Sequence, residues 1–318
     1  MHAAIVTAFD QAPSYQEVAE PQPAAHETVV EVLAAGLHPR VRSQADGSHY
    51  TSTDELPLVP GIDGVGRRED GTLTYFVLPD TRHGAMAERV AIDPRRSVPL
   101  PDGTDPVLVA AAMNPAMSSW VALRRRIEFR AGRSVLVLGA GGNAGRLAVQ
   151  VAKHLGAARV VAVGRGLRDP QPLLTLGADE VVDLGARPET VASGLAATGR
   201  DVDVVLDYLW GRPAADALRA IVPARVDDDQ LLTWVQIGSV AGPDAPVPSA
   251  ALRATRLQIV GSGQGSIPAR DILAELPALV TQICAGGLDI GARSVPLSAV
   301  TDAWTAPRTT QDRLVLVP

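Results

Sequence analysis

A glycine-rich turn at residues 139–145 has the composition that phosphate binding requires. The turn follows a short apolar run, Ser134–Leu138, and precedes an amphipathic segment over residues 147–155. Gly142 would allow the backbone to approach a phosphate, and Gly145 would allow the following helix to lie close to the strand. That helix would point its unpaired N–H groups at the anion. The sequence therefore predicts a dinucleotide pyrophosphate site that comprises Ala140, Gly142, Asn143, Ala144 and Gly145.

The type of dinucleotide depends on the residues that follow the next apolar run. NAD enzymes usually place Asp or Glu about twenty residues after the glycine turn, where it binds the ribose hydroxyls. This chain has Gly164, Arg165 and Arg168 there, and no carboxylate at the strand end. Two arginines could bind a 2′-phosphate through charge-assisted hydrogen bonds. NADPH is the predicted cofactor, although loop arginines can also be ordinary solvated charges.

Two further segments are expected to line the cofactor. Gly238 and Ser239 follow one apolar run, and Ser262 follows the next one along the chain. Ligands of parallel sheets bind beyond the carboxyl ends of the strands, which favours a binding role. Gly-Ser pairs also occur in plain turns, and that alternative stays open.

From residue 134 onward, short apolar runs alternate with amphipathic segments, which is typical of an α/β protein with a doubly wound parallel sheet. Strands are expected at residues 135–138, 160–163, 180–183, 202–206, 233–237 and 258–261, and helices at 147–155, 170–176, 188–197 and 214–220.

The remaining segments predict a second, β-rich domain. Short strands are expected at residues 3–7, 28–35 and 87–92, separated by Pro- and Gly-containing clusters at 21–23, 57–66 and 99–103. Residues 106–127 have helical spacing that Pro115 interrupts, and the tail carries a helix over 272–285 and a strand over 313–317. We expect that last strand to return to the first domain.

Composition restricts the classes of protein. A chain of 318 residues is longer than one hydrophobic core usually accommodates, so two domains are expected. The net charge of -6 argues against a nucleic-acid partner. We identified no apolar run of membrane-spanning length and no signal peptide, and therefore expect a cytoplasmic protein without a membrane partner. Cys284 is the only cysteine, which excludes intramolecular disulfides and cysteine-built zinc sites.

Seven segments along the chain match the motifs of one family in order and spacing. They are Ala34–Pro39 (AAGLHP), Pro60–Gly66 (PGIDGVG), Gly84–Glu88 (GAMAE), Ala116–Trp120 (AMSSW), Gly139–Gly145 (GAGGNAG), Leu174–Asp179 (LTLGAD) and Asp201–Asp207 (DVDVVLD). Together they resemble the medium-chain dehydrogenase/reductase superfamily, in its zinc-free quinone oxidoreductase branch. The resemblance implies a GroES-like β-barrel domain over residues 1–107 and 264–318 and a Rossmann domain over 108–263. It also implies a homodimer joined along the strand at 258–261.

The same resemblance predicts that no zinc takes part. Zinc-dependent relatives have a cysteine where His38 stands and a His-Glu pair where Ile62 and Asp63 stand, and they carry a cysteine-rich loop that is missing here. Three ligands cannot be assembled from these positions. An improvised site of His38, Asp63 and His49 is the remaining alternative.

The resemblance implies hydride transfer from NADPH to a quinone or an α,β-unsaturated carbonyl. His38 replaces a family asparagine at the cleft and could donate a hydrogen bond or a proton. Tyr50 matches a family tyrosine near the substrate, and Ser118 replaces the usual threonine. Ser118 could position the carboxamide or the substrate. His38 could instead be a neutral histidine that bonds to the backbone, and Tyr50 could be a packing residue. Leu184 stands where relatives often carry a tyrosine for the 2′-phosphate.

Two other functions remain open at this point. The chain could be an enoyl or aldehyde reductase of a biosynthetic pathway. It could also be a protein that binds NADPH with little turnover and acts as a sensor or in a moonlighting role. The acidic charge argues against RNA binding in that last case.

Overall fold

The computed structural model describes residues 1–307 and 312–318, which form two compact units. One unit is made from both ends of the chain, Met1–Pro115 and Leu276–Pro318, and the other is the continuous segment Ala116–Glu275. The unit boundaries fall inside two helices, α2 (Pro106–Val121) and α8 (Ala269–Cys284), whereas the sequence prediction placed them at 107/108 and 263/264.

The continuous unit holds a six-stranded sheet in which every pair of neighbours is parallel. The strand order is β10-β9-β8-β11-β12-β13, so the chain winds outward in one direction from β8 and then in the other from β11. This confirms the predicted doubly wound sheet and puts its switch point between β8 and β11. The strands are β8 (Ser134–Leu138), β9 (Arg159–Gly164), β10 (Glu180–Asp183), β11 (Val204–Asp207), β12 (Leu232–Gln236) and β13 (Leu257–Gly261).

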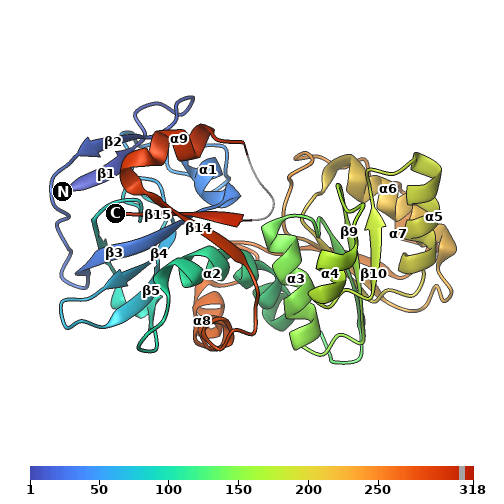
Figure 1. Cartoon of the computed structure of the whole chain (residues 1–318). Coiled ribbons are helices and arrows are strands. Elements are labelled where there is room, and N and C mark those ends of the chain that lie inside the picture. Colours follow the sequence, from blue (N-terminus) through green and yellow to red (C-terminus); the bar gives the residue numbers. More distant parts are fainter. Residues whose placement is uncertain (308–311) are drawn as a thin grey trace. The chain divides into compact units, whose positions relative to one another are not determined.

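Helices cover both faces of this sheet. Figure 1 shows α3 and α4 on one side of β9 and β10, and α5, α6 and α7 on the other. Their buried side chains are mostly Leu, Val and Ala, and Trp234 of β12 is the largest fully buried side chain of the core under α5 and α6. The helices are α3 (Asn143–His154), α4 (Gln171–Thr175), α5 (Pro188–Gly199), α6 (Gly211–Ile221) and α7 (Ala251–Ala254).

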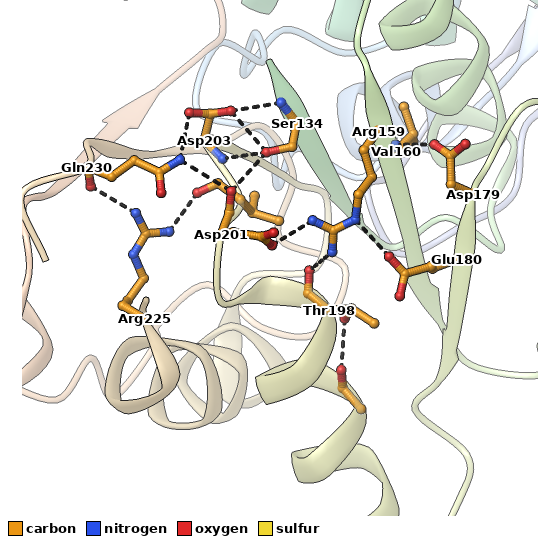
Figure 2. A network of polar contacts seen from close by, with 12 residues as sticks. Ser134, Arg159, Val160, Asp179, Glu180, Thr198, Asp201, Asp203, Arg225 and Gln230 are labelled. Carbon is orange, nitrogen blue, oxygen red and sulfur yellow. Dashed lines mark hydrogen bonds and ion pairs between the residues drawn. The ribbon is translucent and has the colours of Figure 1, made fainter. Parts of the chain in front are cut away.

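A network of polar contacts joins the amino-terminal ends of these strands (Figure 2). Arg159, at the start of β9, bonds to Glu180 at 2.7 Å and to Asp201 at 2.6 Å, and its third nitrogen donates to the carbonyl of Thr198. Asp203 accepts hydrogen bonds from the backbone N–H and the hydroxyl of Ser134 at 2.8 and 2.9 Å. The charge of Arg159 is therefore paired at this edge, and these contacts link the ends of neighbouring strands.

The unit made from both chain ends holds a seven-stranded mixed sheet, ordered β14-β15-β3-β4-β5-β7 with β6 also paired to β3, and a separate β1-β2 pair. Strand β15 pairs with β3 across Leu314 and Leu37, so the last strand does return to the first domain, as predicted. The strands are β1 (His2–Ile5), β2 (Ser14–Glu17), β3 (Thr28–Leu37), β4 (Asp63–Arg67), β5 (Leu73–Val77), β6 (Arg89–Ile92), β7 (Ser97–Pro99), β14 (Gly291–Pro296) and β15 (Asp312–Val317); the short helices are α1 (Pro39–Ala45) and α9 (Val300–Thr305).

Strand β4 corrects the sequence analysis, which treated residues 57–66 as a separator. The glycines there serve close strand pairing rather than a break. A Cβ on Gly64 would lie 2.9 Å from the carbonyl oxygen of Ala34, and one on Gly66 would lie 2.8 Å from that of Glu31. Only glycine lets β4 approach β3 so closely.

Helix α2 corrects a second expectation. It continues through Pro115 into a π-helical turn, Ala122–Arg126, so that residues 106–126 form one helix of 21 residues. An 18-residue window of this helix has a mean hydropathy of 1.3. By length and composition alone, this helix is long and apolar enough to cross a membrane. The sequence analysis expected no apolar run of that length. About two thirds of its apolar window is buried in the structure, as in the core helix of a globular protein.

Candidate functional site

The glycine turn between β8 and α3 is built by three close backbone approaches. The N–H groups of Gly139 and Ala140 both donate to the carbonyl of Val163, at 2.7 and 2.9 Å. Gly139 has a φ of +106°, a conformation that favours glycine. A Cβ on Gly145 would overlap the carbonyl oxygen of Gly139, so a glycine is required there for α3 to begin directly above the turn.

The first turn of α3 fits the phosphates of a dinucleotide. The N–H groups of a first helical turn have no partner within the helix. Around Gly142, the residue before the helix, an added Cβ would meet a single neighbour, the Gly139 oxygen at 3.8 Å, so there is space beside this backbone. The Oδ1 atom of Asn143 is buried and has no hydrogen-bond partner among the described residues. The unpaired N–H groups beside open space suit a bound anion, whereas Oδ1 of Asn143 is an acceptor and would take a donor group instead.

The loop after β9 lies against the glycine turn. A Cβ on Gly164 would come within 3.0 Å of the backbone nitrogen of Gly141, and a Cβ on Gly141 within 3.2 Å of the carbonyl oxygen of Arg165. Arg165 and Arg168 are exposed, and within the described part of the chain neither forms an ion pair. The structure thus brings Gly164 and the backbone of Arg165 against residues 139–145, and Arg168 follows three residues later in the same loop.

The segment after β11 also reaches the glycine turn, which the sequence did not reveal. The Cβ of Tyr208 lies 3.1 Å from the position that a Cβ on Gly139 would take, and a Cβ on Gly238 would lie 2.8 Å from the carbonyl oxygen of Tyr208. Gly238, predicted to line the cofactor, therefore packs against Tyr208, which in turn packs against Gly139 of the turn. Ser262 donates its backbone N–H to Gln236 at 2.8 Å, while Ser239 is exposed beside Gly238.

Tyr208 connects this edge to Ser118, a predicted catalytic residue. The two hydroxyl oxygens lie 2.9 Å apart. Burial raises the pKa of Tyr208 to about 12, even though hydrogen bonds from Ser118 and Ser119 oppose the shift. The phenol is therefore protonated at neutral pH and fixes the orientation of the Ser118 side chain.

Asp207, the last residue of β11, holds the turn that follows it. Its carboxylate accepts hydrogen bonds from the backbone N–H groups of Leu209 and Trp210, each at 2.8 Å, and from the indole of Trp234 at 2.9 Å. Trp210 has a φ of +52°, the one non-glycine residue in the described ranges with positive φ. Strained backbone of this kind needs support from its surroundings, and Asp207 supplies it.

His38 lies in a buried network in the other unit. Its Nε2 atom is 3.1 Å from Oδ1 of Asp63, and the hydroxyl of Tyr75 donates to the second oxygen of that carboxylate at 2.7 Å. Burial lowers the pKa of His38, and Asp63 only partly offsets this effect. The ring is therefore neutral at pH 7, with its proton on Nε2 toward Asp63. Its Nδ1 atom has no hydrogen-bond partner among the described residues and is an acceptor in this tautomer.

This geometry sharpens the prediction made for His38. A neutral ring that donates to Asp63 cannot also donate from Nδ1; it does so only after gaining a proton. Tyr50, the other predicted catalytic residue of this unit, is 70% exposed and stacks on His49 with 4.2 Å between ring centres. The catalytic roles of both residues stay predictions.

Among the described residues, no group of three or more His, Cys, Asp or Glu side chains is placed to hold a metal ion. His38 and Asp63 bond to each other, while His49 lies 2.9 Å from the hydroxyl of Thr51. The improvised set of His38, Asp63 and His49 is therefore not assembled here.

Comparisons with known proteins agree with this arrangement. Residues 144–281 match the family described as zinc-binding dehydrogenase. The chain is 33% identical, over all of both chains, to the probable NADPH-dependent quinone reductase tdiC of Emericella nidulans. The quinone oxidoreductase of Thermus thermophilus, which was also solved in complex with NADPH, is 26% identical with a TM-score of 0.82. The match covers 100% of this chain and 100% of that chain.

A probable oxidoreductase from Mycobacterium abscessus has the same identity, 26%, with a TM-score of 0.80 over 100% of this chain and 99% of its own. Likeness of this extent covers both the glycine turn of the parallel sheet and the unit that holds His38. The chain belongs to the medium-chain dehydrogenase/reductase superfamily, in its quinone oxidoreductase-like branch.

Proposed function

We propose that this protein is an NADPH-dependent oxidoreductase that transfers a hydride to a quinone or an α,β-unsaturated carbonyl. The observation that carries this proposal is the convergence of the glycine turn and the arginine loop at the carboxyl edge of the parallel sheet. The relative that matches over its whole length is itself named as an NADPH-dependent quinone reductase.

Each part of the cofactor has a set of residues suited to hold it. The N–H groups at the start of α3 and Asn143 would bind the pyrophosphate. Arg165 and Arg168 would bind the 2′-phosphate, since guanidinium groups form strong paired hydrogen bonds with phosphates. Gly238, Ser239 and Ser262 would line the remainder. When bound, NADPH supplies the hydride, and the protein supplies orientation.

The acceptor would be oriented by side chains whose hydroxyl or imidazole groups are fixed in place. The phenol of Tyr208 donates to Ser118 or accepts from it, and so fixes the direction in which Ser118 can bond a carboxamide or an acceptor oxygen. For His38 and Tyr50, which belong to the discontinuous unit, we propose a catalytic role that the His38 variant below tests. A hydrogen bond to the acceptor carbonyl would stabilise the negative charge that develops as hydride arrives.

Cofactor binding followed by turnover tests the proposal directly. NADPH fluorescence should change on titration with the protein, and NADPH should then be oxidised in the presence of 1,4-naphthoquinone or a simple enone. Faster turnover of an aldehyde or an enoyl thioester would favour the biosynthetic reductase. Tight binding without turnover of any acceptor would favour the non-catalytic protein instead.

His38 can be tested separately from the cofactor site. His38→Ala should lower kcat by about tenfold or more, because general acid–base groups contribute at least that much. NADPH affinity should stay within twofold, since the residue lies outside the unit that carries the glycine turn. Unchanged kcat would reduce His38 to a packing residue.

Zinc independence is part of the proposal. The chain has Ile62 and Asp63 where zinc-dependent relatives carry a His-Glu pair. Elemental analysis of the purified protein should find no stoichiometric zinc, and chelators should leave turnover unchanged. Loss of activity on chelation, restored by zinc, would contradict this part.

We further propose a cytoplasmic homodimer without a membrane partner. Strand β13 pairs with β12 on one side and carries half-buried Ile259 and Val260, which suits pairing with a second copy. Light scattering should give twice the chain mass, and cell fractionation should recover the protein apart from membranes. The apolar helix at 106–126 makes that fractionation a necessary check.

A further inference from the structure

Asp183, the last residue of β10, lies beside the loop that we propose for the 2′-phosphate. In the parallel pairing of β10 with β9, Asp183 is directly opposite Gly164. The next residue, Leu184, donates its N–H to the carbonyl of Gly164 at 2.7 Å. The carboxylate of Asp183 thus lies at the same edge of the sheet as Arg165 and Arg168. It lies at the end of β10, whereas NAD enzymes carry their carboxylate at the end of the strand that corresponds to β9.

The carboxylate accepts a backbone hydrogen bond within its own turn, and it lies beside that loop. Oδ1 of Asp183 accepts a hydrogen bond from the N–H of Gly185 at 2.9 Å. This bond, the N–H groups of Leu167 and Gly166, and the charge of Arg168 together hold the pKa of Asp183 below its ordinary value. A full negative charge is therefore present at neutral pH, next to the loop.

The loop in turn contacts the glycine turn. Gly164 approaches the backbone nitrogen of Gly141, and Gly141 approaches the carbonyl oxygen of Arg165, each to within 3.2 Å of where a Cβ would stand. A charge on Asp183 therefore lies near the adenosine end of any dinucleotide held by that turn.

We propose that Asp183 determines cofactor specificity: its charge, held opposite Gly164 at the start of the arginine loop, partly cancels that of Arg168 and limits the preference for NADPH over NADH. The inference rests on the proposed function, because it assumes that the arginine loop meets the 2′-phosphate. A phosphate monoester carries about 1.5 to 2 negative charges at pH 7, so a nearby carboxylate repels it and leaves an unphosphorylated ribose unaffected.

Asp183→Asn tests this inference, since asparagine keeps an oxygen that accepts from Gly185 and removes only the charge. At low salt, the dissociation constant for NADPH should fall about three- to tenfold, and that for NADH should stay within twofold. The gain should shrink as salt screens the charge. Both constants are measured by cofactor fluorescence or calorimetry without an acceptor.

Asp179→Asn is the matched control. It makes the same change of charge just before β10, where Asp179 bonds to Lys153 at 2.7 Å and to the N–H of Val160 at 2.6 Å. The control should lower Tm and leave the ratio of the two dissociation constants unchanged. In an Arg168→Ala background, Asp183→Asn should increase NADPH affinity by a larger factor than it does in the wild type, because the arginine no longer offsets the carboxylate.

Three results would overturn the inference. They are an unchanged ratio in Asp183→Asn with both affinities unchanged, an unchanged ratio with both cofactors equally weakened, and weaker NADH with unchanged NADPH, which would mean that Asp183 binds ribose hydroxyls. A wild-type protein that binds neither cofactor would instead refute the proposed function, so the two failures are distinguishable.

Discussion

The two edges of the six-stranded sheet treat their charged side chains in opposite ways. At the amino-terminal edge, the charge of Arg159 is shared between Glu180 and Asp201, and neighbouring polar groups are paired as well (Figure 2). At the carboxyl-terminal edge, Arg165 and Arg168 are exposed and, in the ranges that the structure describes, form no ion pair.

The difference suggests that the charges at one edge stabilise the fold and those at the other bind a ligand. Charges that neutralise each other inside the chain stabilise the fold and have nothing left for a ligand. Charges and buried polar atoms without internal partners cost free energy unless a ligand or solvent satisfies them. The exposed arginines form no ion pair in the described ranges and can meet a ligand, so changes at the two edges should have different effects.

The largest effect is expected from removing both carboxyl-edge arginines. In Arg165→Ala/Arg168→Ala, NADPH should bind roughly 100-fold more weakly, since hydrogen bonds to charged groups contribute about 1.5–3 kcal/mol each. NADH affinity should change by less than about threefold, and Tm should hold, because these side chains make no ion pairs among the described residues. Calorimetric titration of both cofactors provides the measurement. Equal losses would show that the arginines do not read the phosphate.

Gly145→Ala should have the next largest effect. The added methyl group overlaps the carbonyl oxygen of Gly139, so the start of α3 must shift. Overpacking costs about 1–3 kcal/mol, and both cofactors should bind about 10- to 100-fold more weakly.

Gly261→Ala is the control for that substitution, because a Cβ there meets no atom within 4 Å. Its cofactor affinities should equal those of the wild type. If Gly145→Ala bound both cofactors as well as Gly261→Ala does, the glycine turn would not be the pyrophosphate site.

Arg159→Ala probes the opposite edge and should affect stability alone. The side chain is 25% exposed and bonds to two carboxylates and a backbone carbonyl. Its loss should cost about 1–2 kcal/mol and lower Tm by several degrees. The ratio of NADPH to NADH affinity should stay constant. A change in that ratio would break the distinction between the two edges.

The smallest effect is a pH dependence at the amino-terminal edge. Burial opposes ionisation of Asp203, but hydrogen bonds from Ser134 and Gln230 outweigh it and lower its pKa below the ordinary 3.8. A carboxylate whose pKa is lowered in the folded protein stabilises the fold fully at pH values above its ordinary pKa. This contribution is lost as the pH falls through the lowered pKa.

Thermal melts between about pH 2.5 and pH 7 can detect this loss. Tm of the wild type should decline below about pH 4. Asp203→Asn should start from a lower Tm at neutral pH and decline less steeply. Parallel curves for the two proteins would mean that Asp203 contributes nothing to acid stability.

The parallel sheet could be predicted because its signal is local. Each of its strands is a short apolar run between helices, and the strands found at 134–138, 159–164 and 180–183 agree with the prediction to within about two residues. The glycine turn was identifiable for the same reason, since strand, turn and helix are contiguous. Strand β4 was missed because its glycines, required for close pairing, have the composition of a loop.

The contacts across the candidate site could not be predicted, because they depend on which strand lies beside which. Asp183 reaches the arginine loop only through its pairing opposite Gly164, and Tyr208 reaches Ser118 across 90 positions of sequence. The network of His38, Asp63 and Tyr75 depends likewise on the packing of β3 to β5. Sequence periodicity predicts elements but not these lateral neighbours.

The discontinuous unit has a consequence for synthesis of the protein. Residues 116–275 leave the ribosome as one continuous piece and can fold at once, whereas β3 lacks its neighbour β15 until nearly the whole chain has been translated. The nascent chain therefore exposes an unpaired sheet edge for most of its synthesis. Protease treatment of stalled ribosome complexes should find residues 1–115 cleavable long after 116–275 have become resistant, which would make this early segment the part that depends on chaperones.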